Sequence, residues 1–334
     1  MGSLKKILVI RFSSIGDIVL TTPVIRCLKQ QLPGSVIHYL TKRQFEPVLR
    51  ENPYIDKLWL YDNNFKEIIP QLKSGDYNYI IDLHGNYRSA FVKRHFSKNI
   101  STFSKLNFRK WLAVHLKMNI LPDIHIVDRY LKAAESLEIR NDGFGLDYFI
   151  NPEDDVPLSS LPVSHQKGYV AIVIGAKHFT KIFPVEKVAE VCRKLMRPVI
   201  LLGDKEDRDR GETIVGLTNP FVFNSCGKYT LNQSASIVRQ ASATLTNDTG
   251  LMHIAAAFNK PIVSVWGNTI PAFGMYPYRP LNNPAPSLVA EVKSLSCRPC
   301  SKIGFKQCPK KHFKCMNQIE IEPVISFLQS NFEL

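Results

Sequence analysis

The chain has 334 residues, of which 45% are hydrophobic and 22% are charged, and its formal net charge is +14. This composition is ordinary for a globular protein of two medium-sized domains, and no apolar run is long enough for a membrane-spanning helix. Arg11 and Asp17 interrupt the apolar N-terminal run, which is not typical of a signal peptide. The basic excess fits an anionic partner, namely nucleic acid, an anionic membrane or a phosphorylated substrate.

Apolar β-branched segments alternate with amphipathic segments, a pattern that predicts parallel α/β structure. In the first half we expect strands at 5–11, 36–41, 57–61, 77–82 and 99–103, and helices at 17–31 and 127–137. A segment rich in Pro, Ser and acids, 151–166, predicts a linker. In the second half we expect strands at 169–174, 199–202, 243–246 and 262–265, and helices at 185–195, 207–215, 231–240, 250–258 and 320–331. The result is two Rossmann-like domains that face a cleft, with ligands at the carboxyl ends of the strands.

The loop after the first strand has the sequence RFSSIGD and ends at Asp17. It contains one glycine, Gly16, so neither a dinucleotide fingerprint nor a Walker sequence is present. Asp17 stands at the start of a helix. It either caps the helix amides or acts as a general base beside a substrate hydroxyl.

Three strand ends in the second half carry further polar loops. NDTGLMH (247–253) opens a helix whose first-turn amides suit a phosphate, although an ordinary capped helix fits too. The basic loop 175–184 contains Lys181, which can supply a point charge to a diphosphate. LGDKE (202–206) offers an acid for ribose hydroxyls, and the sequence does not choose among Asp204, Glu206 and Asp207.

Taken together, SSIGDIVLTTP, DLHGNYRS, KIFP, LLGDKE and NDTGLMH resemble glycosyltransferase family 9, the ADP-heptose:lipopolysaccharide heptosyltransferases, from residue 5 to about residue 316. The resemblance implies a GT-B fold. It implies an acceptor-binding Rossmann-like domain at 1–160, a nucleotide-sugar-binding domain at 161–318, and a terminal helix at 319–334 that packs back on the first domain. It also implies an inverting transfer that needs no metal or other cofactor.

The family pattern assigns catalytic roles to Asp17, as the general base, and to Lys181, which neutralises the donor diphosphate. The donor-binding residues that it implies are Glu206, Asp248, Thr249, Gly250 and His253. The acceptor-binding residues that we expect are Ser13, Ser14, Gly16, Arg88, Lys93, Arg94 and Arg109.

The basic residues are assigned to the acceptor because of their charge. Residues 83–122 contain eight Lys or Arg residues and no Asp or Glu. The family's acceptor is lipid-anchored and carries anionic groups. Within this stretch, 104–117 predicts an amphipathic basic helix, which is either an ordinary surface helix or one that meets a membrane interface.

The chain has seven cysteines. Three of them (Cys27, Cys192, Cys226) fall in apolar contexts that predict buried thiols. The other four, Cys297, Cys300, Cys308 and Cys315, leave structural zinc, disulfides and free thiols all open.

The sequence thus predicts an enzyme that uses a nucleotide-sugar donor, with ADP-heptose first, and an anionic lipid-linked saccharide acceptor. We expect a monomeric cytoplasmic protein with peripheral contact to the inner membrane and no nucleic-acid partner. The alternatives are a transferase of the same fold with another donor or acceptor, a sugar-nucleotide epimerase, or a basic protein that binds nucleic acid or a membrane surface without catalysis.

Overall fold

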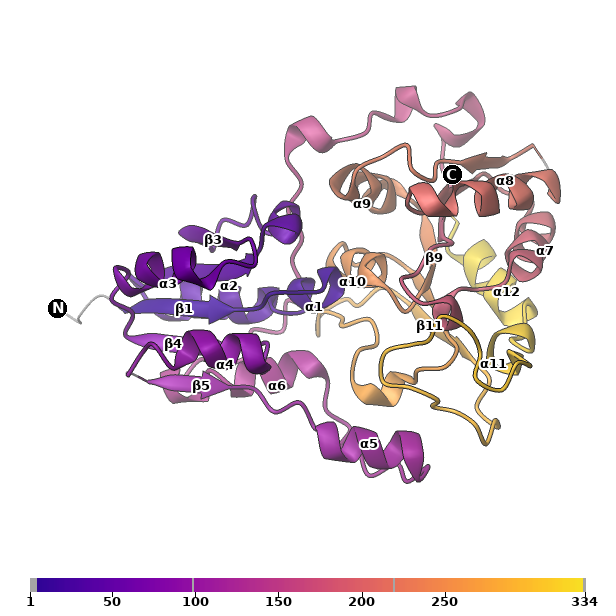
Figure 1. The fold of residues 1–334 in the computed structure, drawn as a ribbon. Coiled ribbons are helices and arrows are strands. Elements are labelled where there is room, and N and C mark those ends of the chain that lie inside the picture. The colour runs from indigo at the N-terminus through magenta and orange to yellow at the C-terminus, as the bar shows by residue number, and fades with distance from the viewer. Residues whose placement is uncertain (1–4, 98, 219, 333–334) are drawn as a thin grey trace. The chain divides into compact units, whose positions relative to one another are not determined.

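The computed structural model describes residues 5–332 except 98 and 219, and the chain forms two compact units, each built on one parallel sheet (Figure 1). Unit 1 comprises Met1–Lys105, Ile124–Phe149 and Pro280–Asn282, and unit 2 comprises Leu106–Asp123, Ile150–Arg279 and Asn283–Leu334. The prediction of two Rossmann-like units is confirmed. The main crossing between them falls after Phe149 rather than at residue 160, and 106–123 belongs to unit 2, which the sequence did not predict.

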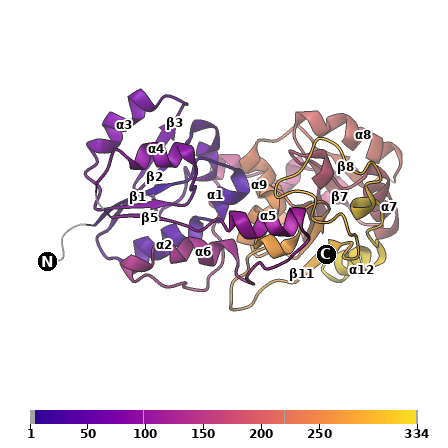
Figure 2. The same cartoon turned by 60° about the horizontal axis from the view of Figure 1, so that its bottom comes forward.

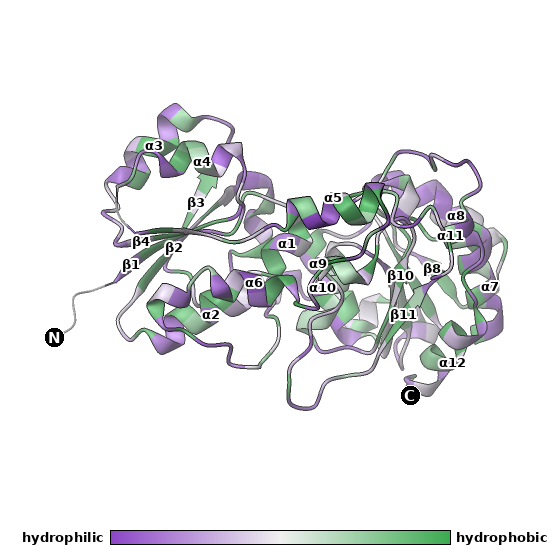
Figure 3. Ribbon diagram, turned by 90° about the horizontal axis from the view of Figure 1, so that it is seen from below, coloured by the Kyte–Doolittle hydropathy of each residue, from purple (hydrophilic) through white to green (hydrophobic). Residues whose placement is uncertain are grey.

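Unit 1 has a five-stranded sheet with strand order β3-β2-β1-β4-β5. Its strands are β1 (Lys6–Ile10), β2 (Val36–Lys42), β3 (Lys57–Tyr61), β4 (Tyr79–Asp82) and β5 (Ile100–Thr102). Its helices are α1 (Ile15–Val19), α2 (Thr22–Gln31), α3 (Phe65–Lys73), α4 (Tyr87–Lys93) and α6 (Ile126–Lys132). Figure 3 shows α3 and α4 on one face of the sheet and α2 and α6 on the other. Because both faces are covered, the central strand β1 is apolar throughout its buried length.

The single helix predicted at 17–31 is divided into α1 and α2. Pro23 lies in the first turn of α2, where its missing N–H costs no helical hydrogen bond and its fixed φ suits a helix start. The division leaves Asp17 in a short helix of its own, directly after β1.

Unit 2 has a six-stranded sheet with strand order β11-β10-β9-β6-β7-β8. Its strands are β6 (Val170–Val173), β7 (Val199–Leu202), β8 (Val222–Asn224), β9 (Ala243–Asn247), β10 (Ile262–Trp266) and β11 (Ser287–Glu291). Its helices are α5 (Asn107–His115), α7 (Val185–Leu195), α8 (Arg208–Gly216), α9 (Leu231–Gln240), α10 (Gly250–Ala257), α11 (Lys314–Asn317) and α12 (Glu322–Ser330). Helices α9 and α10 lie on one face of the sheet, and α7, α8 and α12 lie on the other (Figure 3).

The terminal helix α12 packs within unit 2, which differs from the expectation that it packs on the first domain. Val324, Ile325 and Leu328 are buried in the core of unit 2 together with Val188 and Cys192 of α7. These residues form the apolar face of α12, and this face packs against the core of unit 2.

Each sheet has one topological switch point, where the chain connections from two adjacent strands lead in opposite directions along the sheet. In unit 1 it lies between β1 and β4, and in unit 2 it lies between β6 and β9. Open α/β sheets bind ligands outside the carboxyl ends of the strands at such points. The loops after these four strands contain most of the residues that the sequence singled out. Among the described residues, no helix is both long and apolar enough to cross a bilayer.

Candidate active site

In unit 1, Asp17 is fixed at the end of β1 by two neighbours. One carboxylate oxygen, Oδ1, pairs with Nη2 of Arg11 at 2.6 Å. The other, Oδ2, accepts hydrogen bonds from Ser14 Oγ at 2.7 Å and Ser14 N at 3.2 Å. Asp17 therefore caps α1 as part of a capping box. The same carboxylate lies at the switch point, so the position expected of a general base is also met.

Arg11 is the buried support of this carboxylate. Its Nε donates to the carbonyl of Ser13 at 2.7 Å, and its Nη1 donates to the carbonyl of Leu83, the residue after β4. Burial lowers the pKa of the Arg11 guanidinium, but Asp17, Tyr130 and Tyr39 together raise it, so the pKa is raised overall. A permanent cation thus joins the ends of β1 and β4 and orients Asp17.

His84 is a residue at this switch point that the sequence analysis did not name. Its side chain is buried and meets Phe12 edge-on, with ring centroids 5.3 Å apart. Burial and the charge of Arg11 lower the pKa of His84 to about 3, so the imidazole is neutral at physiological pH. Among the described residues its Nδ1 has no hydrogen-bond partner. The sequence could have indicated His84 by its position, because it lies two residues after the carboxyl end of β4.

The predicted acceptor-binding basic residues separate into three environments. Lys93 is engaged inside unit 1, because its Nζ lies 2.8 Å from Oδ2 of the fully buried Asp82. An acceptor anion would therefore compete with Asp82 for the Lys93 ammonium. Arg88 and Arg94 also belong to the region of α4, and each guanidinium stacks on an aromatic ring, of Tyr87 and Phe91 respectively. Arg109 lies on α5 and therefore belongs to unit 2.

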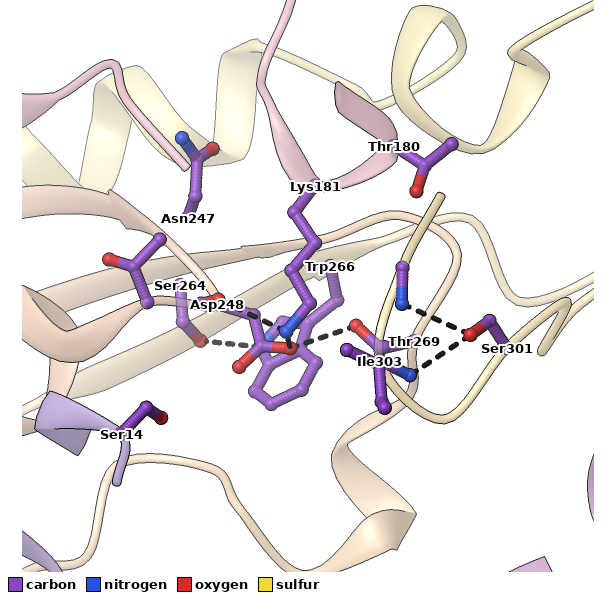
Figure 4. A network of polar contacts seen from close by, with 12 residues as sticks. Ser14, Thr180, Lys181, Asn247, Asp248, Ser264, Trp266, Thr269, Ser301 and Ile303 are labelled. Atoms are coloured by element: carbon purple, nitrogen blue, oxygen red, sulfur yellow. Dashed lines mark hydrogen bonds and ion pairs between the residues drawn. The ribbon is translucent and has the colours of Figure 1, made fainter. Parts of the chain in front are cut away.

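In unit 2, Lys181 and Asp248 meet at the switch point. Nζ of Lys181 lies 2.6 Å from Asp248 Oδ2, and this oxygen also accepts a hydrogen bond of 2.9 Å from Thr269 Oγ1 (Figure 4). Three loops, those after β6, β9 and β10, each contribute one side chain to this group. Asp248 thus holds the ammonium in place, and neither Asp248 nor Thr269 caps α10.

Asn247 joins the β6 and β9 loops beneath this group. Its Nδ2 donates to the carbonyls of Val173 and Gly175, each at 3.2 Å, and its Oδ1 accepts from Phe183 N at 3.1 Å. The asparagine is buried, so it sets the path of the loop that carries Lys181. The sequence analysis quoted its motif without assigning this residue a role.

The turn into α10 has the arrangement expected of a phosphate site. Thr249 is the N-cap residue, and among the described residues no side chain caps the helix. The first amides of α10, at the positive end of the helix dipole, thus receive no hydrogen bond from the side chain of the N-cap residue. His253 is buried in α10.

The three acids after β7 are distinguished by their orientation. Asp207 is buried and accepts a hydrogen bond from Asp204 N, while Asp204 accepts one from Glu206 N. A Cβ on Gly175 would lie 2.0 Å from the Asp207 carboxylate, which explains the glycine. Asp204 and Glu206 are exposed, and Asp204 already accepts the hydrogen bond from the Glu206 amide.

Comparison with known proteins decides which family this arrangement belongs to. Residues 66–311 match the family model described as glycosyltransferase family 9 (heptosyltransferase). The chain belongs to this family. Family 9 membership makes it a glycosyltransferase and excludes the purely binding alternatives.

Individual relatives and solved structures resemble most of the chain. Lipopolysaccharide heptosyltransferase 1 of Campylobacter coli is 25% identical over 291 residues, which are 79% of this chain and 84% of the relative. A family 9 glycosyltransferase structure from Veillonella parvula has a TM-score of 0.78 at 23% identity and covers 98% of both chains. The structure of E. coli heptosyltransferase WaaC with ADP has a TM-score of 0.70 at 20% identity and covers 98% of this chain and 99% of its own. These likenesses confirm the GT-B fold.

The cysteine-rich loop of this family 9 glycosyltransferase contains free thiols. All seven cysteines are unpaired, and Cys300 Sγ donates to the carbonyl of Cys297 at 2.9 Å. Within the described ranges, no three His, Cys, Asp or Glu side chains are arranged to hold a metal ion. Of the three states that the sequence left open, the described cysteines form no disulfide.

The same loop supports the segment that carries Lys181. Thr180 N donates to the carbonyl of Phe305 at 3.2 Å, and Phe305 N donates to Thr180 Oγ1 at 2.8 Å. The rings of Phe179 and Phe313 stack with centroids 5.0 Å apart. These contacts hold the two residues that precede Lys181 against the cysteine loop.

Thr180→Val is expected to lower the free energy of unfolding by about 1–3 kcal/mol, because the amide of Phe305 loses its acceptor in a partly buried position. Urea denaturation followed by circular dichroism measures this change. The KM for the donor should rise together with it, since Lys181 follows directly. Thr180→Ser keeps the hydroxyl and is the matched control. A loss in Thr180→Ser as large as that in Thr180→Val would contradict the assignment of the effect to the hydroxyl.

Proposed function

We propose that this enzyme transfers a heptose from ADP-heptose to the inner core of lipopolysaccharide with inversion of the anomeric configuration, and that Asp17 is the general base. The observation that carries the proposal is the Lys181–Asp248–Thr269 group beside the uncapped turn into α10. The names of the curated relatives and the ADP in the E. coli WaaC structure support the choice of sugar and nucleotide.

On the donor side, unit 2 stabilises the leaving group. As the bond between the anomeric carbon and the diphosphate oxygen breaks, its electron pair stays on the diphosphate. Lys181 and the amides of Thr249 and Gly250 meet this growing negative charge. The amide donors and the Asp248-held ammonium are ordered before the reaction, so they take the place of the divalent cation that other transferases use. Glu206 accepts hydrogen bonds from the ribose.

On the acceptor side, unit 1 activates the nucleophile. Asp17 takes the proton of the acceptor hydroxyl while that oxygen forms its bond to the anomeric carbon. Arg11 and Ser14 fix the carboxylate, so it reaches the hydroxyl in one orientation. Ser13, Ser14 and Gly16 line the approach, and the neutral His84 imidazole offers a further polar contact for the sugar.

Anionic groups of the acceptor are bound by Arg88, Arg94 and Arg109, whose guanidinium groups suit phosphate and carboxylate geometry. Lys93 is omitted from this set, because Asp82 already holds its ammonium. The enzyme acts as a monomer on the cytoplasmic side of the inner membrane, where a lipid-linked acceptor is available.

Isothermal titration calorimetry with ADP, UDP, GDP and an ADP-sugar tests the donor site. We expect ADP to bind at least ~10-fold more tightly than UDP or GDP, which corresponds to about 1.4 kcal/mol. A chelator should leave ADP binding unchanged, because Lys181 and the backbone amides supply the positive charge. Preference for UDP or GDP would replace the heptose assignment with another nucleotide-sugar. Binding that requires Mg²⁺ would contradict the proposed role of Lys181.

A further inference from the structure

Helix α5 exposes apolar side chains where a surface helix normally buries them. Phe108 is 70% exposed and Trp111 is 45% exposed, and only Ala113 of the helix is buried. Leu116 and Met118, which follow the helix, are each more than half exposed. Leu112 and Val114 are half-buried, so the helix covers part of its apolar surface and leaves Phe108 and Trp111 exposed within the described chain.

The exposed aromatic groups form one continuous stripe. The rings of Phe108 and Trp111 are nearly parallel, with centroids 6.5 Å apart, and those of Trp111 and His115 stack at 4.9 Å. This i, i+3, i+7 spacing places the three rings along a single side of the helix. Helix α5 is labelled in Figure 2, and the hydropathy colouring of Figure 3 shows that its ribbon carries both hydrophobic and hydrophilic residues.

The end of this segment is fastened to unit 2. Nζ of Lys117 donates to the carbonyls of Cys297 and Pro299, at 3.1 and 2.8 Å. Lys110 places its Nζ 5.6 Å from the centroid of the Phe273 ring. The helix is thus held by its polar side chains, while its aromatic stripe stays available for an external partner.

The charge around the stripe identifies that partner. Residues 106–122, the part of the acid-free stretch that belongs to unit 2, contain no Asp or Glu, and Arg109, Lys110 and Lys117 lie among them. An aromatic stripe flanked by cations is the pattern of helices that lie in the interface of an anionic bilayer. We propose that α5 and the residues up to Met118 form a docking surface for an anionic phospholipid membrane, with Phe108, Trp111 and Leu116 inserted at the headgroup level.

The three tryptophans of the chain allow a direct test. Trp59 and Trp266 are buried, so Trp111 is the exposed one and its emission reports on the stripe. We expect vesicles of phosphatidylethanolamine and phosphatidylglycerol to shift the emission of the full-length enzyme to the blue and to sediment it. Vesicles of phosphatidylcholine should bind at least ~10-fold more weakly, because the basic residues then lack anionic partners.

Variants separate the stripe from the overall charge. Phe108→Ser combined with Leu116→Ser should weaken partitioning to anionic vesicles at least ~10-fold with Trp111 retained as the reporter. Val163→Ser is the matched control, since Val163 is an exposed apolar residue of unit 2 outside the segment. Because vesicle binding needs neither donor nor acceptor, it can fail while the proposed transferase activity is retained.

Three results would overturn the proposal. The first is an unchanged emission maximum with anionic vesicles. The second is equal binding to anionic and zwitterionic vesicles, or by the double variant and the wild type. The third is a blue shift that appears without lipid as the protein concentration rises, together with a dimer in analytical ultracentrifugation, which would assign the stripe to a second copy of the chain.

Discussion

Asp17→Asn is expected to lower kcat by roughly 10²–10⁴-fold, the range typical of a lost general base. Asparagine keeps the size of the side chain and can still accept the hydrogen bond from Ser14, so α1 should retain its start. It cannot take the proton of an acceptor hydroxyl. The KM for the donor should change little, because the proposed donor site lies in unit 2. Steady-state kinetics with ADP release as the readout measures both constants.

The control for this variant is a second aspartate that pairs with a buried arginine. Asp147 pairs with Arg26 in unit 1, where Asp142 also holds the guanidinium. Asp147→Asn should therefore lower stability without a comparable loss of kcat. Thermal denaturation of both variants separates the two effects. If Asp17→Asn retains kcat within ~3-fold of the wild type, a loss smaller than that of any typical catalytic base, Asp17 is a helix cap and another group is the base.

The sequence predicted the strand ends of this enzyme better than it predicted what the side chains there do. Continuous apolar runs such as β1 and β6 are unambiguous because both faces of a parallel sheet are covered. The neighbouring loops follow directly from them, and Asp17, Lys181 and Asp248 all lie at the two switch points. The sequence does not show, however, that Asp248 turns to Lys181 instead of capping α10, because only the folded loops bring the two together.

Short or half-exposed elements escaped prediction for a physical reason. The strand β8 has three residues, and β11 is an edge strand in which only Ala290 is buried, so neither has a clear apolar pattern. The assignment of 106–123 to unit 2 depends on contacts such as that of Lys117 with the cysteine loop, which is 180 residues away in the chain. The position of α12 similarly depends on which core its apolar face joins, and its amphipathic pattern fits either unit.

Lys181→Ala is expected to lower kcat/KM by about 10²–10³-fold, the usual cost of removing one preorganised donor to a developing negative charge. Nucleotide affinity should fall as well, since the diphosphate is already charged in the ground state. Because Asp248 would lose its 2.6 Å partner, its carboxylate would face the diphosphate unpaired and add repulsion. The double variant Lys181→Ala/Asp248→Asn should therefore bind ADP more tightly than Lys181→Ala alone.

The tighter ADP binding of the double variant would show that Asp248 positions Lys181 and does not itself bind the donor. If Asp248 bound the donor directly, the second substitution would weaken ADP binding further. Lys187→Ala is the matched control, because Lys187 lies on the adjacent helix α7 and pairs with Glu190. It should leave calorimetric ADP affinity and kcat unchanged. Equal losses in Lys181→Ala and Lys187→Ala would mean that overall positive charge, and not the ammonium at the switch point, holds the nucleotide.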